Sequence, residues 1–129
     1  MENYRIYFDV KMLDDALLAK YVTPKIVEES SQYVEATARS FGVLPNEIAT
    51  PTPFMVSQLA LFWAYMTTAW RKASMSLGKS ADNDSFALKF RIFKELLDDL
   101  LAKLTAESFT DGKPARKRTF PSTMEISRS

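Results

Sequence analysis

The chain has 129 residues, of which 47% are hydrophobic and only three are glycine, so its composition excludes a mostly disordered protein and predicts one domain with its own core. It has no cysteine and no histidine. This excludes disulfides, a thiol nucleophile and a zinc–thiolate site, and it removes the commonest general base near neutral pH. The net charge of +1 hides an asymmetry, because residues 1–107 hold 12 Lys and Arg against 14 Asp and Glu, whereas residues 108–129 hold 5 against 2.

Neither a membrane span nor a secretory signal is predicted. No stretch approaches about 18 consecutive apolar residues, and the first residues (MENYR) lack the basic-then-apolar order of a signal peptide. We therefore expect a protein made and kept in a reducing cytosol, or assembled into a larger particle there.

Residues 1–12 are predicted to form an extended N-terminal strap over a helical core. Residues 4–10 (YRIYFDV) are rich in aromatic side chains, which suits a short strand or an ordered strap. Residues 13–21 (LDDALLAKY) then predict a short helix, because Asp14 and Asp15 would lie in its first turn, where the helix macrodipole favours acids.

The first long helix is predicted from Pro24 to Phe41. Thr23 is placed to cap it, Pro24 takes the first helical position and Gly42 follows its end. Apolar residues fall on or near one face of this helix: Ile26, Tyr33, Val34, Ala38 and Phe41. Residues 44–52 contain several turn signals and predict an irregular connection.

A second long helix is predicted from Pro53 to about Leu77. Its main apolar positions recur at steps of three and four: Val56, Leu59, Trp63, Met66, Trp70, Ala73 and Leu77. Leu61, Phe62 and Tyr65 widen this surface, so the helix is expected to be central and packed on more than one side. Tyr65 lies off the main seam and is the aromatic residue expected to face a partner.

A third long helix is predicted from Ser85 to Glu107, after a polar loop at residues 78–84. Its apolar residues again repeat at helical spacing: Phe86, Phe90, Phe93, Leu97, Leu100, Leu101 and Leu104. The sequence therefore predicts an all-α fold. We expect a small helical bundle of one short and three longer helices over residues 13–107, followed by an extended C-terminal arm at residues 108–129.

Residues suited to catalysis or metal binding are few. The adjacent carboxylates at 14–15 and 98–99 diverge by about 100° on a helix, so neither pair converges on one metal or proton. Asp82, Asn83 and Asp84 resemble the start of a calcium loop, but the required glycine and terminal acid are missing. There is no glycine-rich phosphate loop. We expect no enzymatic activity, no cofactor and no metal site.

The C-terminal arm combines two kinds of side chain. Four cations precede three large apolar residues: Lys113, Arg116, Lys117 and Arg118, then Phe120, Met124 and Ile126. A disordered end, a nucleic-acid-binding arm that neutralises phosphates and a docking arm that becomes ordered on a partner are all compatible with this composition. The docking arm is favoured over the nucleic-acid arm, because phosphate binding alone needs many cations and few large apolar groups.

The order of these features resembles the small helical head–tail connector (adaptor, or neck) proteins of tailed bacteriophages and prophages. The resemblance covers about residues 13–107 together with a C-terminal extension in the same place. It is carried by four short segments: YVEA (33–36), FGV (41–43), LALFWAY (59–65) and FALKF (86–90). The segment before Leu13 departs from the family pattern.

The resemblance implies a structural protein of the virion, assembled in the host cytoplasm, in which about a dozen copies form a ring beneath the portal. Its C-terminal extension, residues 109–129 here, would anchor the ring on the portal. The implied partners are the portal ring, copies of the same chain and other neck or tail-completion proteins. DNA would pass through the channel without specific binding, and no membrane is involved.

Two alternatives stay open. One is a nucleic-acid-binding helical protein such as a terminase small subunit, and the other is a different neck or tail-completion protein. For the connector, contacts between neighbouring copies are expected at Tyr65 and at charged residues of the bundle: Arg39, Arg71 and Lys72 against Glu28, Glu29 and Asp98.

Overall fold

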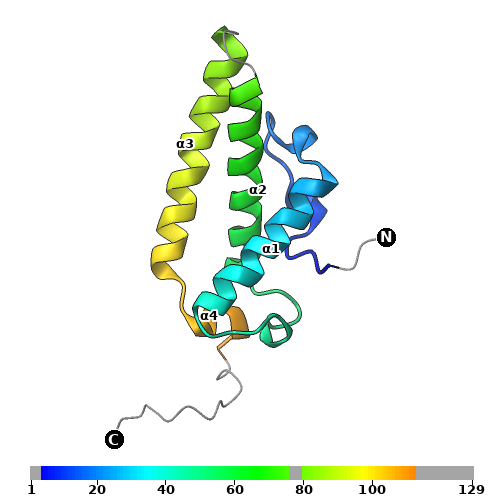
Figure 1. Cartoon of the computed structure of the whole chain (residues 1–129), viewed down its shortest axis with the longest axis vertical. Coiled ribbons are helices and arrows are strands. Elements are labelled where there is room, and N and C mark those ends of the chain that lie inside the picture. The colour runs from blue at the N-terminus through cyan, green and yellow to red at the C-terminus, as the bar shows by residue number, and fades with distance from the viewer. Residues whose placement is uncertain (1–3, 76–79, 113–129) are drawn as a thin grey trace, which may run out of the picture.

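The computed structural model describes residues 4–75 and 80–112, which form helices, turns and irregular connections and contain no β-strand (Figure 1). Four helices are present: α1 (Pro24–Ser40), α2 (Phe54–Met75), α3 (Ser80–Lys103) and the short α4 (Ala106–Thr110). Three single 3-10 turns lie between or before them: η1 (Val10–Met12), η2 (Ala19–Tyr21) and η3 (Pro45–Glu47). The predicted all-α bundle is confirmed.

Helix α2 is the centre of the fold. In Figure 1, α3 runs beside it as the second half of a long hairpin, and α1 crosses its lower half diagonally. Val56, Leu59, Ala60, Ala64 and Ala69 of α2 are all fully buried. These five residues point to several sides of the helix, because α2 is covered by α1, α3 and the N-terminal segment together. The expectation of a central helix is confirmed.

Helix α1 begins and ends where its sequence predicts. The Thr23 hydroxyl accepts a hydrogen bond from the Ile26 N–H at 3.2 Å, and Pro24 occupies the first helical position. At the other end Gly42 has φ of 81°, a left-handed conformation that glycine adopts without steric cost. The chain then turns back through Val43, which is fully buried.

The short helix predicted at residues 13–21 is wrong. These residues form a turn and then η2, after the 3-10 turn η1. The Asp15 carboxylate accepts hydrogen bonds from the N–H groups of Leu17 and Leu18, each at 2.9 Å. Such local side-chain bonds offer the backbone an alternative to a regular helix. Asp15, which was predicted to be an acid in the first turn of a helix, therefore stabilises a turn instead.

The end of the bundle also differs from the prediction. Helix α3 begins at Ser80 and ends at Lys103, and α4 follows after a break, with the Thr105 N–H bonded to the Ser108 hydroxyl at 3.0 Å. Phe109 of α4 is fully buried, and its ring centroid lies 5.7 Å from that of Phe41. The body of the protein therefore extends beyond the predicted boundary at Glu107, and α4 belongs to it.

Candidate functional site

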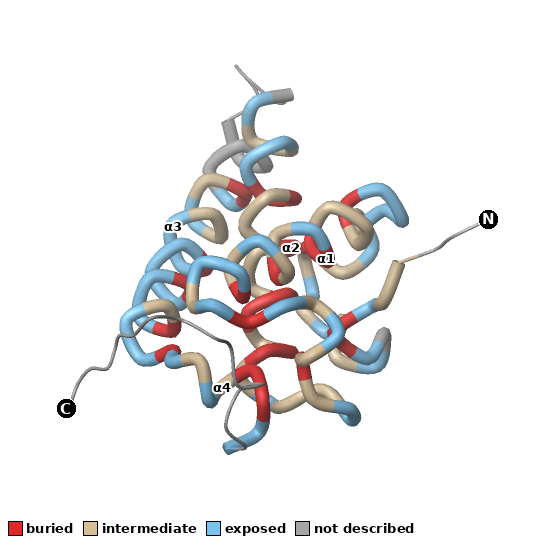
Figure 2. Tube along the Cα trace, turned by 60° about the horizontal axis from the view of Figure 1, so that its bottom comes forward, coloured by how far each residue is buried: buried red, intermediate tan, exposed pale blue. Residues whose placement is uncertain are grey.

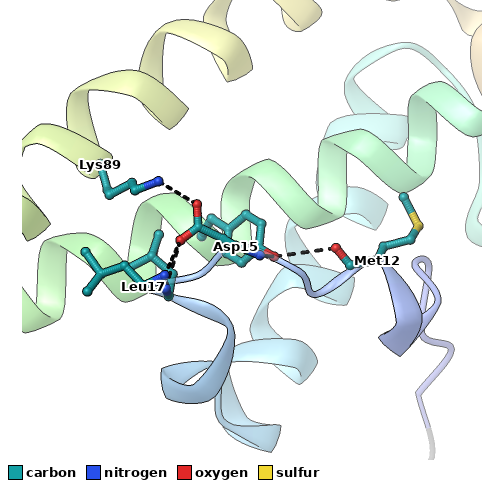
Figure 3. Close-up of polar contacts among 6 residues, drawn as sticks. Met12, Asp15, Leu17 and Lys89 are labelled. Atoms are coloured by element: carbon teal, nitrogen blue, oxygen red, sulfur yellow. Dashed lines mark hydrogen bonds and ion pairs between the residues drawn. The ribbon is translucent and has the colours of Figure 1, made fainter.

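A cluster of polar side chains joins the N-terminal segment (residues 4–22) to the α2–α3 hairpin (Figure 3). The Asp15 carboxylate accepts a hydrogen bond from the Lys89 Nζ of α3 at 2.8 Å, in addition to the bonds from Leu17 and Leu18. The Asp15 backbone N–H donates to the Tyr65 hydroxyl of α2 at 3.0 Å, and this hydroxyl in turn lies 3.5 Å from the Met12 carbonyl oxygen. One turn of the N-terminal segment is thus tied to both long helices.

The electrostatics of this cluster fix its protonation. Burial on its own raises the pKa of Asp15, but the bonds from Lys89 and from two backbone N–H groups, with the charge of Lys89, outweigh it and hold that pKa below its ordinary value. Burial raises the pKa of Tyr65. At neutral pH Asp15 is therefore ionised and Tyr65 neutral, so neither group is set to exchange a proton there. The geometry suits a structural clasp.

A second set of contacts fixes the start of the same segment. The Arg5 guanidinium donates to the carbonyl oxygens of Ile48 at 3.0 Å and Ala49 at 2.6 Å, and to the Thr52 hydroxyl at 2.8 Å. Tyr7, 2% exposed, lies beneath this guanidinium at 4.7 Å from its ring centroid. Arg5 thus binds the connection between α1 and α2.

Buried serines of the helices hold the backbone of this segment. Ser31 of α1 donates to the Arg5 carbonyl oxygen at 2.5 Å, and Ser57 of α2 donates to that of Tyr7 at 2.8 Å. These contacts were not predicted from the sequence. Two sequence features could have indicated them. Arg5 is a single cation within an aromatic run, and three serines (Ser30, Ser31, Ser57) occupy positions that the helices bury.

The prediction that Tyr65 faces a partner is wrong for this chain. Tyr65 is 2% exposed, and its ring centroid lies 4.8 Å from that of Phe93 on α3. Tyr65 lies off the main seam of α2, on a side of the helix that the N-terminal segment covers. The Asp15 N–H of that segment donates a hydrogen bond to the Tyr65 hydroxyl.

Of the residues predicted to form charged contacts between copies, some contact other residues of the same chain and others lie at the surface. Arg71 of α2 forms an ion pair with Glu29 of α1 at 2.9 Å, so a pair expected between copies exists within one copy. Lys72 lies 4.2 Å above the ring centroid of Tyr21 in η2. Arg39 is exposed and Glu28 half-buried on α1, which leaves both at the surface.

Seven residues of the C-terminal arm carried the binding hypothesis, and all seven lie outside the described residues: Lys113, Arg116, Lys117, Arg118, Phe120, Met124 and Ile126. The structure does describe the point from which they depart. Asp111 and Gly112 follow α4 in left-handed conformations, and the Gly112 N–H bonds to the Glu107 carbonyl oxygen at 3.0 Å. The arm therefore leaves from a defined turn at the end of the bundle where α3 also ends (Figure 1).

Several large apolar side chains remain exposed. Three lie on α3, at Leu88, Ile92 and Leu96, and we name this row the α3 stripe. Four others lie elsewhere on the surface: Ile6, Leu44, Phe54 and Trp70. The apolar spacing of α3 predicted its buried seam but not the stripe, because leucines and isoleucines that follow helical spacing do not themselves indicate which of two faces is covered.

Among the described residues, fold and contacts define an all-α protein whose N-terminal segment is tied to the two long helices and whose last residues, Asp111 and Gly112, form a turn after α4. Within residues 4–75 and 80–112, no group of three or more metal-ligating side chains lies together, and no helix has the length and apolar character to cross a bilayer. No protein-family model matches the sequence, and neither a curated protein nor a solved structure matches it.

Proposed function

We propose that this protein is a structural head–tail connector of a tailed phage or prophage, which forms a ring beneath the portal and docks on it through the C-terminal arm. The observation that carries the proposal is the anchored exit of the arm. Phe109 is fully buried in the bundle, and its carbonyl oxygen accepts a hydrogen bond from the Ala49 N–H at 2.9 Å. An arm held at its base by a rigid body loses less entropy on docking than one that leaves from a mobile end.

The chemistry of the arm fits a protein partner. Its cations suit acidic groups, and Phe120, Met124 and Ile126 supply the apolar anchors that a protein pocket requires. The body has the opposite sign of charge, since residues 1–107 carry a net charge of −2. A ring with such walls would let DNA pass without holding it, and it would have the portal, its own copies and other neck proteins as partners in the virion.

The test is co-sedimentation with the portal ring encoded in the same genome. A chain that ends at Gly112 lacks the distal arm but keeps α4, whereas a chain that ends at Glu107 would lose Phe109 from the core and confuse unfolding with lost docking. We expect the full chain to bind and the shorter chain not to bind. Two substituted chains separate the contributions of charge and apolar contact: one with Lys113→Gln, Arg116→Gln, Lys117→Gln and Arg118→Gln, the other with Phe120→Ser, Met124→Ser and Ile126→Ser.

A titration with duplex DNA at two salt concentrations addresses the nucleic-acid alternative. Binding through phosphates falls steeply as salt rises, because released counterions drive it. If the full chain ignores the portal and binds DNA in a salt-sensitive way that the four glutamine substitutions abolish, the connector proposal fails and a DNA-packaging role replaces it. If both substituted chains bind the portal like the full chain, the arm is not the docking element.

A further inference from the structure

The N-terminal segment is tied to the helices through side chains. Among the described residues, each hydrogen bond that joins residues 5–22 to the helices or to the 48–52 connection has a side-chain group as donor or acceptor. The backbone–backbone bonds of these residues stay within the segment, such as the bond from the Tyr21 N–H to the Leu18 carbonyl oxygen at 2.8 Å. The segment can therefore leave the helices without breaking a backbone hydrogen bond of α1, α2 or α3.

Two sets of contacts hold the two ends of the segment. The first, which we name the Arg5 latch, consists of the bonds from the Arg5 guanidinium to the 48–52 connection. The second, the Asp15 clasp, joins Asp15 to Lys89 of α3 and to Tyr65 of α2 (Figure 3). The latch and the clasp share no hydrogen-bond partner among the described residues, so each can be weakened separately.

Few side chains of the segment are buried. Three of those described are buried, Tyr7, Phe8 and Leu18, and Figure 2 shows intermediate and exposed positions along most of the chain that begins at the label N. A region with few buried apolar side chains opens at a lower free energy than the core of its domain. The start of α1 lies outside the segment, because the Thr23 hydroxyl caps it through the Ile26 N–H. Helix α1 thus keeps its N-terminal cap when the segment opens.

We propose that the N-terminal segment is a strap that opens from the helices as one unit while α1, α2 and α3 stay folded. Opening uncovers Tyr65 and the hydroxyl groups of Ser31 and Ser57. The Ser31 hydroxyl keeps a partner in the open state, because it also lies 3.3 Å from the Val27 carbonyl oxygen. The strap thus controls access to the side of α2 that carries Tyr65. This inference does not depend on the connector proposal, because it requires neither a portal nor a ring.

Opening as one unit requires that the latch and the clasp be coupled. Amide hydrogen exchange of the full chain, measured by NMR, reports the opening of single N–H groups. The Leu17 and Leu18 N–H groups are bonded to the Asp15 carboxylate at the clasp. We expect Arg5→Met to speed their exchange about tenfold or more, because the loss of bonds from a charged group at the latch favours the open state. Arg91→Met, at an exposed position of α3, is the control and should leave these rates unchanged. Unchanged rates in Arg5→Met would overturn the single unit.

A substitution in the bundle separates opening of the strap from unfolding of the whole domain. Leu100 is buried on α3, and Figure 1 shows this half of α3 and the N-terminal segment on opposite sides of α2. Leu100→Ala should speed exchange in the middle of α2 about thirtyfold or more. The Leu17 and Leu18 rates should stay the same, because the helices are folded in both the closed and the open state. An equal acceleration of all these amides would overturn the proposal.

Urea provides a third measurement, which needs no substitution. The urea dependence of exchange grows with the surface that an opening exposes. We expect a shallower dependence for the Leu17 and Leu18 amides than for those in the middle of α2, because opening of the strap exposes one segment and unfolding exposes the whole core. This measurement also decides the question if Arg5→Met or Leu100→Ala fails to fold. Equal dependences in the wild type would mean that the segment opens only when the whole domain unfolds, and they would refute the strap.

Discussion

Phe109→Ala is the substitution that best tests where the body of the protein ends. Phe109 is fully buried and packs on Phe41, although it lies beyond the residue at which the sequence places the end of the bundle. Truncation of a buried phenylalanine costs about 3–5 kcal/mol, from lost transfer free energy and the cavity left behind. The hydrogen bond from the Ala49 N–H goes to the Phe109 backbone carbonyl, so the substitution leaves it in place.

The measurement is urea unfolding followed by circular dichroism, with a thermal melt beside it. A loss of this size should lower the melting temperature by roughly 10–20 °C for a domain of this length. Glu107→Ala is the matched control in the same short helix, because Glu107 is exposed and should change stability by less than about 0.5 kcal/mol. If Phe109→Ala costs less than about 1 kcal/mol, α4 is not docked on the bundle.

Three further predictions concern the contacts that hold the N-terminal segment and the surface. Arg5→Met should lower the free energy of unfolding in urea by about 2 kcal/mol, because the hydrogen bonds from the Arg5 guanidinium to the 48–52 connection are lost. An equal loss in the exposed control Arg39→Met would refute this role of Arg5. Asp15→Asn should destabilise at neutral pH. The pKa of Asp15 is lowered in the folded protein, so the stabilisation by its carboxylate is present above the unfolded pKa of 3.8 and disappears as pH falls through the native pKa. A difference in unfolding free energy between Asp15→Asn and wild type that stays constant from about pH 7 to about pH 2 would contradict the clasp. Arg71→Ala should cost less than about 1 kcal/mol, because its ion pair with Glu29 is partly exposed, and a loss above about 2 kcal/mol would show that the pair is coupled to the core.

The long helices were predictable because their signals are local. Thr23 and Pro24 set the start of α1, and Gly42 follows its end, through capping and backbone preferences that act over four or five residues. The apolar spacing of α2 predicted a buried helix, and its additional apolar residues predicted cover on several sides. Neither signal requires knowledge of what the helix touches.

The errors arose where a residue's role depends on a distant partner. Asp15 has the position of a helix-terminal acid in the sequence, but its carboxylate accepts bonds from the Leu17 and Leu18 N–H groups in a turn and from Lys89, 74 residues away. Tyr65 has the position of a surface aromatic on α2, but the N-terminal segment lies on it. Such segments have no apolar period of their own, so their docking cannot be read from spacing.

The two long helices differ in the cover of their additional apolar residues. On α2, Leu61 and Tyr65 lie outside the main seam and are buried, and Tyr65 contacts both Phe93 of α3 and the N-terminal segment. On α3, Leu88, Ile92 and Leu96 lie outside the seam and are exposed. One side of the hairpin thus demonstrates how this sequence buries surplus apolar surface, under a non-helical segment fixed by an Asp–Lys pair.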